Sequence, residues 1–170
     1  FTGQHGMRFL TMGSLFINQP EHKNVENYYR ELDIENAVAV TRYMVDGVTY
    51  TRTVFSSFAD NVIVVRMEAD KPKALNFDLS YNSPLKHVVM AKGNELVVKC
   101  EGMEQEGIPA ALNAECRVLV RHNGKSGKSN KSVVVDQATV ATLYISAATN
   151  FVNYHDVGGN ASKLASSILK

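Results

Sequence analysis

Two runs of alternating β-branched and aromatic residues flank the dipeptide Asp46-Gly47, and no other stretch constrains the fold as strongly. Asp-Gly is the favoured filling of a two-residue type I′ turn, because both central residues need positive φ. If Val45 and Val48 close the turn, Tyr43 lies opposite Tyr50 in an antiparallel hairpin. The same register pairs Ala39 with Val54 and Val40 with Thr53. Cross-strand pairs of this kind stabilise a sheet, so we expect a β-hairpin here.

Short strand patterns bounded by turn residues recur along most of the chain. We expect about nine to eleven strands, at intervals of roughly ten residues. They fall in residues 1–19 (one or two strands), 38–45, 48–58, 62–69, 75–81, 87–91, 95–100, 110–120, 133–135 and 139–147. Several of these runs are apolar on both faces, as expected where two sheets stack. The predicted fold class is therefore all-β, an antiparallel β-sandwich.

Two connecting segments are harder to assign. Residues 31–37 (ELDIENA) could form a short helical turn, but they run so directly into the hairpin that we favour an entry into its first strand. Residues 121–131 (RHNGKSGKSNK) contain no apolar side chain. A polar tip of this kind is expected to be solvated and mobile.

The C-terminal part changes character after the last strand. Residues 150–159 are irregular, and Asn160 is a good N-cap for a helix over residues 161–170. Leu164, Ile168 and Leu169 lie on one side of that helix at helical spacing. Such a short helix is unstable in isolation, so we expect it to continue into a further part of the protein. The predicted organisation is a β-sandwich domain over residues 1–159, with residues 160–170 beginning a helix that leaves it.

Charge and cysteine content exclude few functions. Lys plus Arg (18) nearly cancel Asp plus Glu (17), and the net charge of +1 gives no reason to expect a nucleic-acid partner. No apolar run reaches membrane-spanning length, so no membrane partner is expected. Cys100 and Cys116 are too few for a disulfide framework, and buried free thiols are the favoured interpretation. A bridge between them stays open if their strands adjoin.

No catalytic or metal site is predicted from the residues alone. Glu101, Glu104 and Glu106 could suggest the paired carboxylates of a glycosidase, but they lie in a glycine-rich connection that favours a solvated loop. The chain has five histidines, none of them at a metal-ligand spacing: His5, His22, His87, His122 and His155. We therefore expect no catalytic residue, no metal and no cofactor in this chain.

A long ordered set of motifs surrounds the hairpin. The stretch from Tyr29 to Arg66 closely resembles the N-terminal domain of glycoside hydrolase family 95, the α-L-fucosidases. The residues that carry the resemblance are Tyr29-Arg30-Glu31-Leu32-Asp33, Asp46-Gly47-Val48, Tyr50, Arg52, Phe55, Ser57, Asp60 and Val62-Ile63-Val64-Val65-Arg66. Weaker matches extend it in both directions: Met12-Gly13-Ser14-Leu15, where Ser14 replaces the usual acid, Glu106-Gly107-Ile108, and the run from Ala147 to Tyr154.

The resemblance implies one domain of a large inverting hydrolase that acts on terminal α-L-fucosyl or α-L-galactosyl residues. In that family a β-supersandwich precedes a helical linker and an (α/α)₆ barrel, and the barrel supplies the catalytic groups. Residues 160–170 would then begin the linker helix, and Phe151, Tyr154 and Asp156 would lie nearest the barrel. The partners implied are this catalytic domain and, through it, a glycan. The resemblance also implies that the whole hydrolase to which this domain belongs, called the parent below, is exported to the periplasm or cell surface.

A stand-alone carbohydrate-binding β-sandwich is the alternative function. Such a module is expected to present a flat aromatic platform to its sugar. Trp is absent, and most of the 7 Tyr and 7 Phe fall on alternating strand positions typical of a core. The non-catalytic domain of a hydrolase is therefore the favoured hypothesis.

Overall fold

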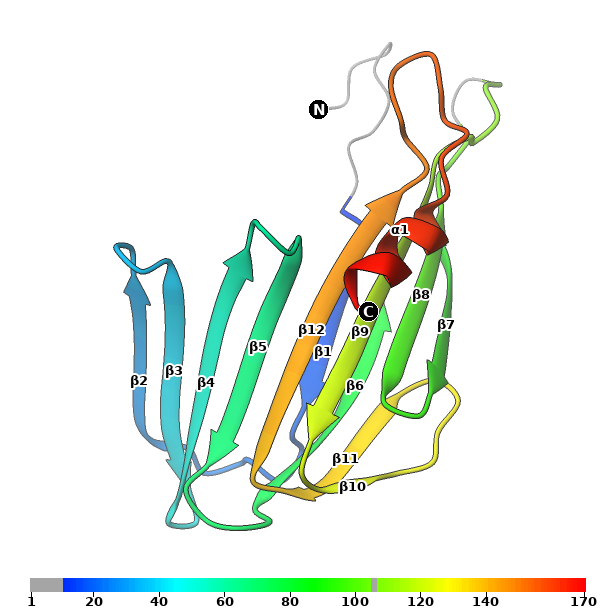
Figure 1. Cartoon of the computed structure of the whole chain (residues 1–170). Coiled ribbons are helices and arrows are strands. Elements are labelled where there is room, and N and C mark those ends of the chain that lie inside the picture. Colours follow the sequence, from blue (N-terminus) through cyan, green and yellow to red (C-terminus); the bar gives the residue numbers. More distant parts are fainter. Residues whose placement is uncertain (1–10, 105–106) are drawn as a thin grey trace.

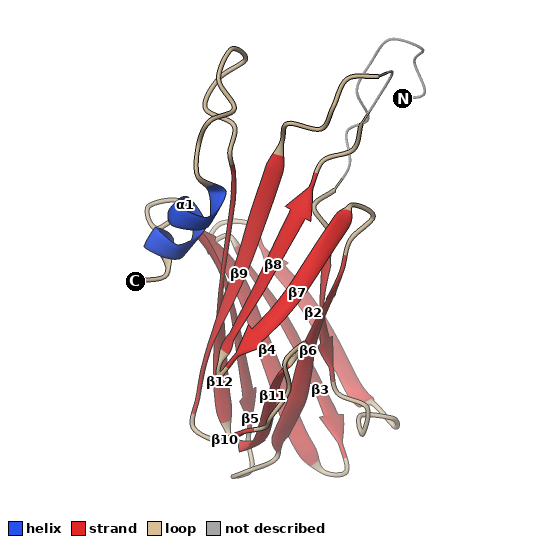
Figure 2. Cartoon of the chain, turned by 90° about the vertical axis from the view of Figure 1, so that its right-hand side faces the viewer, coloured by secondary structure: helices blue, strands red, loops and turns tan. Residues whose placement is uncertain are grey.

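The computed structural model of the chain describes residues 11–104 and 107–170. Within these residues, two antiparallel sheets face each other and one short helix lies on the larger sheet (Figure 1). Figure 2, turned by 90°, shows the helix beside the strands on one side of the molecule. The predicted all-β sandwich is confirmed.

The larger sheet has eight strands in the order β2-β3-β4-β5-β12-β9-β8-β7, and every neighbouring pair is antiparallel. Its strands are β2 (Glu26–Asp33), β3 (Val38–Val45), β4 (Val48–Ser57), β5 (Val62–Ala69), β12 (Val140–Thr149), β9 (Asn113–His122), β8 (Glu95–Glu101) and β7 (Lys86–Lys92). The expected strands after the hairpin are thus confirmed, with shifts of a few residues at their ends.

The smaller sheet has four strands in the order β1-β6-β11-β10. They are β1 (Ser14–Asn18), β6 (Leu75–Asn82), β11 (Val133–Ala138) and β10 (Lys125–Ser126). Of the strands expected in residues 1–19, β1 is present, whereas the positions of Met7 and Phe9 lie outside the described residues. Together the two sheets have twelve strands in the described part of the chain, one more than the upper expectation.

The core lies between the two sheets. Leu75, Phe77 and Leu79 alternate along β6 and are at most 3% exposed, as their period-two spacing predicts. Val98 on β8 and Val118 on β9 belong to the same cluster and are fully buried. Burial of each such side chain contributes about 1.5–3 kcal/mol, so this layer dominates the stability of the domain.

The hairpin at Asp46-Gly47 has the predicted geometry. Asp46 has φ 50° and Gly47 has φ 70°, the two positive values that a type I′ turn requires. Val45 lies opposite Val48 and Tyr43 opposite Tyr50, in the expected register. The two tyrosine rings stack with centroids 5.6 Å apart. The turn residues and the stacked tyrosines therefore favour the same hairpin register.

The expected entry of residues 31–37 into the hairpin strand is wrong. Residues 26–33 form the separate strand β2, and residues 34–37 make the turn into β3. The Asp33 side chain causes this turn, because its Oδ1 accepts hydrogen bonds from the backbone N–H groups of Glu35 (3.0 Å) and Asn36 (2.9 Å). β2 is thereby folded back as the edge strand of the larger sheet.

The expected solvated tip at residues 121–131 is also wrong in part. β9 continues to His122, and Lys125–Ser126 pair with β11 as the strand β10. Two glycines make this pairing possible, because a Cβ at Gly124 would meet the backbone of Asp136 and one at Gly127 would lie 2.7 Å from the Val134 side chain. Because this segment has no apolar side chains, its pairing depends on the close approach of its backbone to β11, which glycine allows.

Helix α1 (Ala161–Ile168) is capped as predicted but packs through a different face. The Asn160 side chain accepts a hydrogen bond from the backbone N–H of Lys163 at 2.8 Å. Ala161 and Ala165 are the buried residues of the helix, whereas Leu164 is 50% exposed. Small side chains let the helix approach the sheet closely, which the apolar stripe did not reveal. In the described part of the chain, no helix has the length and hydrophobicity needed to cross a membrane.

The two cysteines are free thiols in the core. Cys100 on β8 is 2% exposed and Cys116 on β9 is 4% exposed. Their strands do adjoin, but the cysteines are not opposite each other, since Cys100 pairs with Ala114 and Cys116 with Val98. The favoured interpretation of buried free thiols is confirmed.

Candidate functional site

One end of the larger sheet carries most of the exposed apolar side chains in its connections. Antiparallel strands alternate in direction, so the β2–β3, β4–β5, β8–β9 and β12–α1 connections all leave the sheet at the same end (Figure 1). The tips of these connections are Ile34 (85% exposed), Phe58 (96%), Ile108 (64%) and Tyr154 (84%). We call the end formed by these four residues and Phe151 the apolar end. Large exposed apolar side chains gathered from separate loops are typical of a protein contact surface.

The connections at the opposite end have a different composition. The β3–β4, β7–β8 and β9–β10 turns there consist of Asp46-Gly47, Gly93-Asn94 and Asn123-Gly124. None of these residues is a large hydrophobic, and we call this the polar end. These three turns therefore differ from the apolar tips at the other end, although Val25 in the β1–β2 connection is 46% exposed.

The three predicted interdomain residues lie together in the β12–α1 connection. Phe151 is 52% exposed and Tyr154 is 84% exposed, so both rings are available to a partner. Asp156 instead holds the loop in shape: its Oδ1 accepts from the Gly158 backbone N–H at 2.7 Å, and its backbone pairs with Asn153. The loop therefore presents its aromatic rings from a hydrogen-bonded frame.

Asn150, which the sequence did not single out, anchors this loop to the β8–β9 connection. It is 5% exposed, and its Oδ1 accepts from the Asn113 backbone N–H at 2.8 Å. Its Nδ2 donates to the carbonyls of Ala111 (2.9 Å) and Val157 (2.7 Å). One buried amide thus fixes two of the four connections at the apolar end relative to each other.

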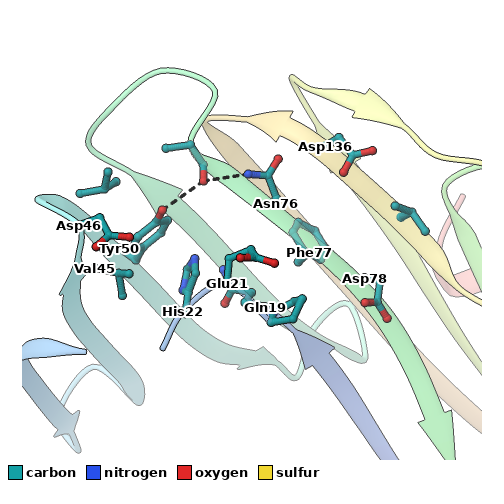
Figure 3. A pocket seen from close by; sticks show the side chains of 14 residues that line it. Gln19, Glu21, His22, Val45, Asp46, Tyr50, Asn76, Phe77, Asp78 and Asp136 are labelled. Atoms are coloured by element: carbon teal, nitrogen blue, oxygen red, sulfur yellow. Dashed lines mark hydrogen bonds between the residues drawn. The ribbon is translucent and has the colours of Figure 1, made fainter. Parts of the chain in front are cut away.

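A pocket of about 250 Å³ opens between the sheets at the polar end (Figure 3). We call it the inter-sheet pocket; it is lined by the β1–β2 connection, the β3–β4 hairpin, β6 and β11. A small polar network lies beside the pocket, which two of its members, Gln19 and His22, also line. His22 Nδ1 lies 2.9 Å from the Tyr43 hydroxyl, which donates to Gln19 Oε1 at 3.2 Å, and Arg52 donates to the same oxygen at 3.2 Å. The network fastens the β1–β2 connection to the larger sheet.

The pKa shifts of His22 and Tyr50 favour the neutral form of each group in the inter-sheet pocket. Burial lowers the pKa of His22, with a further contribution from the positive charge of Arg52, so the imidazole tends to stay neutral. Burial raises the pKa of Tyr50, which keeps its proton and donates to the Ala74 carbonyl at 3.2 Å. Tyr50 is 8% and Phe77 3% exposed, so neither ring offers a flat platform to a sugar.

The groups considered for catalysis or metal binding do not converge. Glu101 is the last residue of strand β8, not part of a loop, and pairs with Lys86 at 2.7 Å on the surface, whereas Glu104 is exposed in the connection that follows. His5 and Glu106 lie outside the described residues. Among the residues that the structure does describe, no three His, Cys, Asp or Glu side chains gather as they would to hold a metal ion.

The chain matches known proteins over most of its length. A model of the family described as "Glycosyl hydrolase family 65, N-terminal domain" matches residues 1–154. The chain belongs to this family. It is also 32% identical over 149 residues to Alpha-L-fucosidase 2 of Arabidopsis thaliana, a match that covers 74% of this chain and 17% of that protein. The resemblance to the N-terminal domain of an α-L-fucosidase is confirmed, and the chain spans about a sixth of the relative's length.

In this glycosyl hydrolase family 65 N-terminal domain, the sequence alone indicates only the part of the apolar end that lies in the β12–α1 connection. Phe151 and Tyr154 were singled out, whereas Ile34 and Phe58 were not. Both lie in turns, where large apolar side chains are uncommon. A search for large apolar residues at predicted turn positions would have found them, but only the strand order shows that they share one end of the sheet.

Proposed function

We propose that this chain is the non-catalytic N-terminal β-sandwich domain of a multidomain inverting glycoside hydrolase. The parent would act on terminal α-L-fucosyl or α-L-galactosyl residues of glycans, with its catalytic groups in an (α/α)₆ barrel outside this chain. The name of the relative supports the substrate class. Residues 160–170 would begin the linker to the barrel, and the parent would be exported to the periplasm or cell surface.

The observation that carries the proposal is the apolar end. Phe58, Ile34 and Tyr154 are each at least 84% exposed. Transfer of one such side chain from water to an interface is worth about 1.5–3 kcal/mol. Contact with the barrel would remove these side chains from water. The hydrogen bonds of Asn150 hold part of the contact surface in place before that contact forms. The domain would thus support the barrel without touching the reacting bond.

Hydrolysis and stability together test the proposal. The parent protein should release fucose from an α-L-fucosyl substrate, and the 170-residue chain alone should release none. Phe58→Asp and Tyr154→Asp should lower the melting temperature of the parent while leaving that of the 170-residue chain nearly unchanged. Lys71→Asp, in the β5–β6 connection at the polar end, is the matched control and should change the melting temperature of neither protein. Fucose release by the 170-residue chain would contradict the assignment.

The inter-sheet pocket is the feature that could favour the alternative, a carbohydrate-binding module. Its buried rings argue against that function, because sugar binding relies on an exposed aromatic face. Glycan titration followed by NMR separates the two. Dose-dependent shifts of resonances around His22 and Asn76 at millimolar or lower glycan concentration would establish the binding module, and unchanged spectra would leave the structural domain as the function.

A further inference from the structure

The outer face of the larger sheet carries an apolar row next to α1. Register places Phe55 on β4 opposite Val64 on β5, Val64 opposite Tyr144 on β12, and Tyr144 opposite Leu119 on β9. These four residues point away from the smaller sheet, since the residues that alternate with them, such as Val65 and Val118, belong to the core. We call these four residues the apolar row. A sheet face that is open to water is normally polar. Val64 is already buried and Tyr144 and Leu119 are half-buried, so the Phe55 end of the row is the part left for a covering group.

The apolar row is the floor of a groove of about 410 Å³. Helix α1 covers the neighbouring part of the same face, where Ser146 donates to the carbonyl of Ala165 at 2.8 Å (Figure 1). The groove begins where α1 ends, and Ile168 and Leu169 form its wall on that side. Phe55, at the far end of the row, is 38% exposed. The helix therefore leaves the Phe55 end of the apolar row uncovered.

Charged side chains also line the groove: Arg121 and Lys170 are basic and Asp60 is acidic. The next row of the same face consists of Thr53, Arg66, Thr142 and Arg121, aligned by the same strand pairs. Arg66 is paired with Glu68 at 2.8 Å, whereas Arg121 is exposed at the groove. An occupant that presents an apolar stripe with an acidic side chain beside Arg121 would match both the floor and this charge.

The length of the apolar row suits a helix. Three spacings between four neighbouring strands amount to about 14 Å. At 1.5 Å per residue, this span corresponds to roughly ten helical residues, or nearly three turns. Apolar side chains at i, i+3 or i+4, and i+7 of such a helix would contact the row. α1 already crosses β12 and β9 on this face, so a second helix across the strands repeats an arrangement that the molecule uses.

We propose that this groove binds one amphipathic helix of the parent polypeptide, from the part that follows Lys170. This inference rests on the proposed function, in which the chain is one domain of a longer hydrolase. Lys170 itself lines the groove, so a continuing chain starts at its rim. The matched relative is much longer than the 17% of its length that aligns with this chain, so a protein of that kind has polypeptide to supply the helix.

Thiol accessibility tests the groove directly. Phe55→Cys places a reactive thiol on the apolar row, and the native Cys100 and Cys116 are buried. Val88→Cys is the matched control, since Val88 is 57% exposed on the edge strand β7, outside the groove. Position 55 should react with iodoacetamide roughly tenfold or more slowly in the parent than in the 170-residue chain, whereas position 88 should react alike in both. Equal rates at position 55 in the two proteins would overturn the proposal.

A photoreactive residue at position 55 identifies the occupant. The expected crosslink joins it to a helical peptide after Lys170 in the same polypeptide. A crosslink between two copies, or protection of position 55 in the 170-residue chain as its concentration rises, would overturn the proposal in favour of a dimer. Tyr154→Cys separates this inference from the proposed function: protection at 154 with full reactivity at 55 would keep the docking of the apolar end and reject the groove.

Discussion

Replacing Asn150 by alanine should destabilise the domain more than any other single change in the β12–α1 connection. The side chain is 5% exposed and makes three hydrogen bonds of 2.7–2.9 Å to backbone groups of Asn113, Ala111 and Val157. The substitution removes the partner of these three backbone groups, whose hydrogen bonds to Asn150 are partly buried. At about 1 kcal/mol for each lost bond, the expected loss of unfolding free energy is roughly 3 kcal/mol.

Urea unfolding of the 170-residue chain, followed by fluorescence or circular dichroism, measures this loss. The midpoint should fall while the slope stays the same, since the surface exposed on unfolding is unchanged. Asn153→Ala is the control, because Asn153 accepts one hydrogen bond from His155 N–H in an exposed part of the same loop. Its effect should stay within about 0.5 kcal/mol. A loss for Asn150→Ala no larger than that of the control would refute the reasoning.

Three further predictions concern other parts of the domain. Ala165 is fully buried against the sheet, so Ala165→Leu should cost about 1–3 kcal/mol, whereas Leu164→Ala, at a 50% exposed position, should cost about 0.5 kcal/mol or less in the same denaturant assay. Burial lowers the pKa of His22 below its ordinary 6.5, so the unfolded chain binds the proton more readily. The free energy of unfolding should therefore be highest above pH 6.5 and fall as the pH drops from 6.5 towards the folded pKa. In His22→Phe this pH dependence should disappear. Burial raises the pKa of Cys116 to about 11, so Ellman's reagent at pH 7.5 should find no thiol in the native chain and two after unfolding, and rapid reaction of the native chain would contradict its burial.

The parts of the fold that follow from local chemistry could be predicted from the sequence. The turn at Asp46-Gly47 and the alternation of Leu75, Phe77 and Leu79 need only neighbouring residues, and both have the expected geometry. The N-cap at Asn160 belongs to the same class. In each case a short side chain or a simple period decides the backbone without help from distant segments.

The parts that depend on tertiary packing could not be predicted. The segment before Asp33 forms a strand because the Asp33 side chain closes a turn, although its polar residues gave no clear strand pattern. The packed face of α1 could not be predicted, because the small side chains of Ala161 and Ala165, rather than Leu164, lie against the sheet. The apolar end is hidden in the sequence for a similar reason, since only the strand order shows that Ile34 and Tyr154 lie at the same end of the larger sheet.

Hydrogen exchange of the parent protein against the 170-residue chain tests the central claim, that the apolar end is a docking surface. Backbone amides in residues 34–37, 58–61 and 150–159 should exchange more slowly in the parent, because the proposed catalytic domain would cover these connections there. Amides of the Asp46-Gly47 turn, at the polar end, should exchange at the same rate in both proteins. Unchanged exchange at all three apolar connections would contradict the account.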